Sequence, residues 1–176
     1  LWQVVARDLQ QDFPPLFTLN ILTNNLPIQM TSFIGREKEI AEIAQTIREH
    51  RLVTLTGIGG TGKTRLSLQA SADLIDEFPD GIWFTQLAPI SDAALVPQAV
   101  ASVWNVHEQP GRALSELLIE YARTKHLLLI LDNCEHVVET SAHLADELLQ
   151  NAPNLKILAT SRVTLNLPGE MIYPVN

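Results

Sequence analysis

The sequence predicts an α/β fold in which helices cover both faces of a mostly parallel sheet. Short, almost wholly apolar runs alternate with longer segments whose apolar residues recur at helical spacing. The 176 residues, 46% of them hydrophobic and 18% charged, suffice for one domain with a substantial core. This composition excludes a disordered chain and leaves little room for a second full domain.

Two parts of the chain differ in pattern. Residues 1–30 show no sustained period of 2.0 or 3.6 and hold several prolines, so we expect an extended linker from an upstream domain. Residues 31–176 carry the alternating pattern and form the predicted domain. The chain begins at Leu1 rather than Met and ends without a closing helix, so we interpret it as a fragment of a longer protein.

The individual elements follow from local pattern. Short apolar runs rich in β-branched residues predict strands at 52–56, 81–87, 127–131 and 155–160, with a last short one at 171–175. Apolar residues spaced three and four apart predict the helices. These are a helix from near Gly35 to near His50 that Thr31 or Ser32 can cap, one through 66–75, and helices over 93–103, 114–123 and 137–150.

One loop carries a phosphate-binding pattern. The run Gly57-Ile58-Gly59-Gly60-Thr61-Gly62-Lys63-Thr64 fits G-x-x-x-x-G-K-[ST] at every fixed position and lies between a strand and a helix. Such a loop wraps backbone N–H groups around phosphate oxygens, which requires glycines where the chain turns or approaches the ligand. The alternative, a glycine-rich turn with a chance lysine, fits this context less well.

The loop predicts the fold family and the ligand. We expect a P-loop NTPase with a three-layer sandwich that binds ATP or ADP with Mg²⁺. Lys63 should reach the β- and γ-phosphates, and the Thr64 hydroxyl should coordinate Mg²⁺. We expect Arg65, the next residue, to contribute to nucleotide binding as well.

A second metal ligand is expected at the end of another strand. Asp132 follows the apolar run 127–131, at the carboxyl edge where open α/β sheets bind ligands. A turn aspartate is the alternative. Asn133 stands where many hydrolysing P-loop ATPases carry a second acid, and an amide can orient water but cannot accept its proton. Glu135 could accept that proton, or could instead cap the next helix, so we expect slow hydrolysis.

An arginine follows the strand at 155–160. Arg162 should point towards the same crevice, where its guanidinium could bind a γ-phosphate and report its loss. A solvated arginine in a surface ion pair is the alternative.

Four ordered blocks resemble the nucleotide-binding core of STAND-class signalling ATPases. The resemblance runs from about Pro27 to the end and is closest to the NB-ARC type of multidomain bacterial transcriptional regulators and cyclase-linked ATPases. Thr31-Ser32-Phe33-Ile34-Gly35-Arg36-Glu37-Lys38-Glu39 is similar to the hhGRExE motif, and the P-loop follows. The other blocks are Leu128-Leu129-Ile130-Leu131-Asp132-Asn133-Cys134-Glu135-His136 and Thr160-Ser161-Arg162.

The resemblance implies further roles. Phe33, Ile34 and Arg36 would lie near the base or the phosphates, and Arg162 would act as a nucleotide sensor. Such proteins switch between a closed ADP state and an open ATP state that self-associates. The family's helical and winged-helix subdomains have no counterpart before Asn176. The expected partners are therefore the nucleotide, flanking domains of the same polypeptide and, in the ATP state, a second copy.

Composition narrows the remaining function classes. The formal net charge of −8, from 12 Lys and Arg against 20 Asp and Glu, argues against direct nucleic-acid binding by this fragment. No stretch reaches the roughly 18 apolar residues of a membrane span. The single cysteine, Cys134, excludes an internal disulfide and is expected to be a small buried residue, which fits a cytoplasmic location.

Two other function classes remain open on the sequence. A small-molecule phosphotransferase could use the same loop, although it would need cationic side chains on a closing lid and residues 163–169 offer none. An interaction scaffold with a vestigial loop is the third class, and it would bind neither ATP nor ADP.

Overall fold

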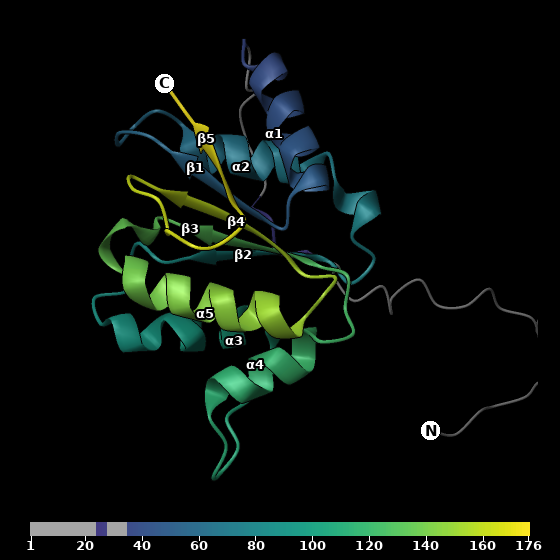
Figure 1. The fold of residues 1–176 in the computed structure, drawn as a ribbon, viewed down its shortest axis with the longest axis vertical. Helices are drawn as coiled ribbons and strands as arrows, with labels where there is room; N and C mark the ends of the chain where they lie inside the picture. The colour runs from purple at the N-terminus through teal and green to yellow at the C-terminus, as the bar shows by residue number, and fades with distance from the viewer. Residues whose placement is uncertain (1–23, 28–34) are drawn as a thin grey trace, which may run out of the picture.

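A five-stranded, wholly parallel sheet forms the centre of the computed structural model, which describes residues 24–27 and 35–176 (Figure 1). Its strand order is β2-β3-β4-β1-β5. The expected α/β class is confirmed, and the sheet is all parallel rather than mostly so. The strands are β1 (Leu52–Thr56), β2 (Ile82–Gln86), β3 (Leu128–Asp132), β4 (Lys156–Ser161) and β5 (Glu170–Pro174).

Helices cover both faces of the sheet. One face packs against α1 (Glu37–Glu49) and α2 (Lys63–Ala72). The other packs against α3 (Val96–Trp104), α4 (Leu114–Ala122) and α5 (Val138–Asn151). Each layer closes its own buried apolar cluster, as the alternating sequence pattern requires. Figure 1 shows the two layers on opposite sides of the strands.

Two helix predictions need correction at their ends, whereas α1 begins and ends close to where it was expected. The helix expected through 66–75 ends at Ala72 and is followed by a short 3-10 helix, η2 (Ile75–Glu77). The helix expected at 93–103 starts as a 3-10 turn, η3 (Ala93–Leu95), before α3. Arg36 is the N-cap of α1 and makes no side-chain cap hydrogen bond. The cap predicted at Thr31 or Ser32 lies outside the described residues.

The described part of the N-terminal segment lies along the outer strand of the sheet. Asn24 forms a parallel bridge with Ile82 in β2. The side chain of Asn25 donates to the Phe84 carbonyl at 2.9 Å and accepts the Phe84 N–H at 2.5 Å. Residues 24–27 therefore occupy backbone groups at the β2 edge.

Within residues 24–27 and 35–176, no helix is both long and apolar enough to cross a bilayer.

Candidate functional site

The loop between β1 and α2 lies at the carboxyl edge of the sheet. Gly62, with a φ of 88°, takes the left-handed conformation that precedes the first residue of α2 and that side chains disfavour. Gly57 is needed for space, since a Cβ there would lie 2.4 Å from the Val175 carbonyl oxygen. The first N–H groups of α2 have no acceptor within the helix, so they present donors to an anion.

Lys63 is held inside this loop. Its side chain is buried, and Nζ donates to the carbonyl oxygens of Gly57 and Ile58, both at 2.9 Å. Thr61 also donates to Ile58, from Oγ1 at 3.1 Å. The ammonium group therefore lies within the concavity that the loop encloses, where an anionic ligand would meet it.

The Asp132 carboxylate joins three elements. It is 3% exposed at the end of β3, and its Oδ1 accepts two hydrogen bonds, from Thr64 Oγ1 and from Thr160 Oγ1, both at 2.7 Å. Thr160 Oγ1 in turn accepts the backbone N–H of Asn133 at 2.9 Å. The structure thus brings together Thr64 and Asp132, the two residues predicted as metal ligands, and adds Thr160, to which the sequence pattern assigns no role of its own.

The Thr64 hydroxyl and the Asp132 carboxylate supply oxygen ligands that fit a magnesium ion carried by a nucleotide. Hydroxyl and carboxylate oxygens are the ligands that Mg²⁺ prefers, and it is usually held by one or two protein oxygens together with phosphates and water. Thr64 donates its proton to Asp132, which leaves oxygen lone pairs of the hydroxyl for a cation. No group of three or more His, Cys, Asp or Glu side chains suited to a metal occurs among the described residues, and a nucleotide-borne ion needs none.

Glu135 and Arg162 approach the loop from two further strand ends. Glu135 lies in η4 (Cys134–His136), directly after β3, and Arg162 follows β4. Arg162 Nε lies 3.2 Å from Glu135 Oε1. A Cβ built on Gly59 would be 3.3 Å from an Arg162 terminal nitrogen, so the guanidinium lies against the P-loop.

The side chain of Arg36 contacts the backbone of the P-loop. One terminal nitrogen donates to the Thr61 carbonyl at 2.7 Å, and the other donates to Asn176 O at 2.9 Å and to Glu39. Arg36 therefore ties the start of α1 to the P-loop and to the chain after β5. Arg65 lies in the first turn of α2. Phe33 and Ile34 lie outside the described residues.

Asn133 is turned towards a histidine. Its φ of 69° is left-handed, a conformation that asparagine tolerates. Its Nδ2 lies 3.5 Å from His136 Nδ1, while His136 Nε2 lies 3.0 Å from the Leu87 carbonyl and 2.9 Å from that of Ile90. We assign the Nε2–H tautomer, which donates to these carbonyls and accepts from the Asn133 amide. Sequence reasoning missed this structural role of His136.

Cys134 is buried, as expected. Burial raises the pKa of its thiol to about 12, so the thiol is protonated at neutral pH. The residue next to Asn133 therefore packs as a small apolar group.

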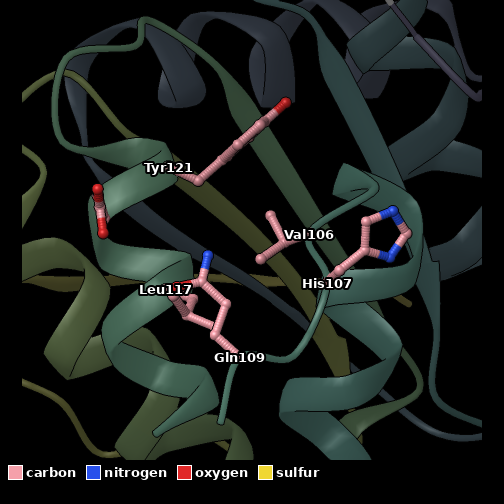
Figure 2. Close-up of a pocket in the computed structure, with 6 residues that line it drawn as sticks. Val106, His107, Gln109, Leu117 and Tyr121 are labelled. Atoms are coloured by element: carbon pink, nitrogen blue, oxygen red, sulfur yellow. The ribbon is translucent and has the colours of Figure 1, made fainter. Parts of the chain in front are cut away.

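A separate hollow of about 350 Å³ lies between α4 and the segment after α3 (Figure 2). Leu117 and Tyr121 of α4 face Val106, His107 and Gln109 across it. Among the residues that the structure describes, none of those predicted for nucleotide binding lines it.

Two bacterial relatives match most of this chain. A protein of Mycobacterium bovis, itself uncharacterised, is 37% identical over 146 residues, which are 83% of this chain and 37% of that protein. A Mycobacterium tuberculosis protein, named as an HTH-type transcriptional regulator, is 40% identical over 129 residues, 73% of this chain and 14% of the relative. The chain thus spans little more than a third of the first relative and about a seventh of the second. No family model matches it.

Solved structures with similar coordinates share the fold. One is a Signal Transduction ATPase with Numerous Domains (STAND) protein with a tetratricopeptide repeat sensor from Pyrococcus horikoshii. It has a TM-score of 0.54, 19% identity, and covers 85% of this chain and 24% of its own. Another is the ORC2 protein of Aeropyrum pernix in ADPNP and ADP complexes, with a TM-score of 0.56, 13% identity, and coverage of 81% and 48%. The chain therefore has the α/β fold of P-loop NTPases.

Proposed function

We propose that this P-loop domain is the nucleotide switch of a larger regulatory ATPase of the STAND class and NB-ARC type, working in the cytoplasm. It binds ATP or ADP with Mg²⁺ and hydrolyses ATP slowly. The observation that carries the proposal is the meeting of the P-loop, Thr64 and Asp132 at one edge of the sheet, with 2.7 Å between Thr64 Oγ1 and Asp132 Oδ1.

The chain's own groups divide the work of binding. The N–H groups of the loop and of the first turn of α2 receive the phosphate oxygens. Lys63 exchanges its bonds to the Gly57 and Ile58 carbonyls for phosphate oxygens, which are charged acceptors and therefore stronger. Thr64 and Asp132 would hold Mg²⁺, which when bound neutralises charge on the β- and γ-phosphates.

Hydrolysis depends on Glu135 as the base, because Asn133 occupies the position where many hydrolysing P-loop ATPases carry an acid. The amide of Asn133 cannot accept a proton, and it faces His136. Glu135 is the nearby carboxylate, and it is engaged by Arg162. Weak turnover follows from this arrangement, which suits a switch better than a metabolic enzyme.

The switch itself requires a contact that ADP cannot make. Only a ligand with different affinities for two states shifts their equilibrium. Lys63, Mg²⁺ and Arg162 would all gain a partner in the γ-phosphate, and Arg162 already lies against Gly59 of the loop. The relative named as an HTH-type transcriptional regulator supports the view that occupancy controls flanking domains and self-association.

Nucleotide titration of the chain and a matched pair of lysine variants tests the proposal. Lys63→Ala should weaken ATP·Mg²⁺ binding about 10- to 150-fold, the value of a lost charge-assisted contact. Lys125→Ala removes the same charge just before β3, at the opposite edge of the sheet, and should bind normally. Unchanged affinity of Lys63→Ala would refute the site.

A second assay separates the switch from a phosphotransferase. Phosphate release from ATP, followed with and without small-molecule acceptors, should be slow and should not depend on the acceptor. Acceptor-dependent loss of ATP without phosphate release would instead show a kinase. If calorimetry detects neither ATP nor ADP binding, the chain is an interaction scaffold.

A further inference from the structure

The ion pair between Glu135 and Arg162 leaves one carboxylate oxygen unused. Oε1 of Glu135 faces Arg162 Nε at 3.2 Å. Its Oε2 is buried and has no hydrogen-bond partner among the described residues. A buried carboxylate oxygen without a donor is unfavourable, so this atom is positioned for a donor that the described residues do not supply.

Arg162 lies between the Glu135 carboxylate and the P-loop. Its side chain is 63% exposed, whereas that of Glu135 is 18% exposed, so the arginine is the more mobile partner of the pair. One of its terminal nitrogens lies against Gly59, where a Cβ would come within 3.3 Å. The guanidinium is therefore adjacent both to the Glu135 carboxylate and to the loop predicted to hold a phosphate.

We infer that the ion pair between Glu135 and Arg162, called the latch below, is regulated by the γ-phosphate. Arg162 pairs with Glu135, the base of hydrolysis, until a γ-phosphate competes with Glu135 for the guanidinium. This inference rests on the proposed nucleotide-binding function and adds a regulation of that site. A γ-phosphate carries more charge than a carboxylate and offers the guanidinium bidentate contacts, whereas ADP offers no such competitor. Glu135 and Arg162 are therefore paired when ADP is bound (the latch is closed) and separated when ATP is bound (the latch is open).

Opening the latch frees Glu135 for chemistry. In the open state the Glu135 carboxylate is no longer paired with Arg162. The water oxygen bonds to the γ-phosphorus, a water proton passes to Glu135 Oε2, and the bond to the bridging oxygen breaks with its electron pair remaining on ADP. The proton then leaves Glu135 to solvent, so the sum is ATP and water to ADP and inorganic phosphate.

The test compares affinities for ADP and for a non-hydrolysable ATP analogue, each with Mg²⁺, in the 176-residue chain. Glu135→Gln removes the competing charge and should tighten analogue binding relative to ADP about two- to fivefold, the range of a partly exposed ion pair. It should also slow single-turnover hydrolysis at least about tenfold, because the amide cannot accept a proton. Arg162→Gln should weaken the analogue but not ADP, and the double variant should match Arg162→Gln.

A matched control comes from another arginine–glutamate pair. Arg112 and Glu120 pair at 2.7 Å beside α4, remote from the P-loop, so Glu120→Gln should leave both affinities unchanged. An unchanged ratio of analogue to ADP affinity in Glu135→Gln, with both nucleotides still bound, overturns the latch alone. If the unmodified chain binds neither nucleotide, the proposed function fails and the latch fails with it. Glu135→Gln alone decides the matter if Arg162→Gln does not fold.

Discussion

Replacing Thr160 with valine removes one hydroxyl from the centre of the candidate site. The side chain is 1% exposed, donates to Asp132 Oδ1 at 2.7 Å and accepts the Asn133 N–H at 2.9 Å. Valine has nearly the same shape but can do neither. The variant therefore leaves the half-buried Asn133 N–H without this partner and the carboxylate with one donor instead of two.

The size of the effect follows from these two losses. An unpaired buried N–H costs about 1–3 kcal/mol, and a hydrogen bond to a charged group contributes about 1.5–3 kcal/mol. Because neighbouring groups relax and Thr64 still holds Asp132, we expect Thr160→Val to lower the free energy of unfolding by about 2–4 kcal/mol. Losing a partner that orients a metal ligand typically weakens metal affinity about 10- to 100-fold, so the Mg²⁺ requirement of nucleotide binding should rise accordingly.

Urea denaturation and a Mg²⁺ titration at fixed ATP measure the two effects. Thr54→Val is the matched control, because the Thr54 hydroxyl in β1 is also fully buried but has no partner among the described residues. Its removal should be neutral or slightly stabilising. Thr160→Ser keeps the hydroxyl, so its Mg²⁺ requirement for nucleotide binding should equal that of the unmodified chain. Equal stability losses in the two valine variants would refute the reasoning.

Three further outcomes follow from other contacts. Burial raises the pKa of the Cys134 thiol to about 12, so a thiol reagent at pH 8 should label it only after urea unfolding; rapid labelling of the native chain would contradict this. Arg48 lowers the pKa of the Glu77 carboxyl below its usual 4.5. The pair therefore contributes its full stabilisation, under about 1 kcal/mol, above pH 4.5. This contribution is lost as the pH falls through the lowered pKa. Arg48→Gln should abolish that part of the acid dependence in pH-resolved urea titrations, and an unchanged profile would exclude the pair as its source. Gly57→Ala would place a Cβ 2.4 Å from the Val175 carbonyl, so it should lower the melting temperature and disturb the bond from Val175 N to Thr56 O, visible as faster amide exchange; protection equal to the unmodified chain would count against the close approach.

The sequence could predict the strands and the fold because burial and chemistry agree there. All five residues of β3 are buried, and four of them are apolar before Asp132. The end of α2 could not be predicted in the same way. Leu74 keeps the helical spacing and is fully buried, yet the chain turns at Asp73 and continues as η2. Apolar spacing indicates which side chains are buried, whereas the hydrogen-bond pattern decides where a helix ends.

The candidate site was predicted as separate blocks, and their joining residue depends on the strand order. β4 lies between β1 and β3, so its carboxyl end falls between the P-loop and Asp132. No spacing along the chain gives that neighbourhood. The motif Thr160-Ser161-Arg162 therefore predicts no role for Thr160, although its hydroxyl contacts the carboxylate that both Thr64 and the proposed Mg²⁺ require.

Side-chain alternation explains why two buried threonines differ in partners. Leu128 and Ile130 pack towards α1 and α2, so Asp132 faces the same layer, at whose P-loop end Thr64 begins α2. Leu158 also faces that layer, and Thr160 shares its face. Thr54 alternates with Val53 and Leu55 of that layer and so points the other way, into the apolar cluster under α3 to α5. A one-residue slip of β4 would exchange these environments and remove a donor from Asp132, so the register of β4 and the geometry of the candidate metal site are fixed together.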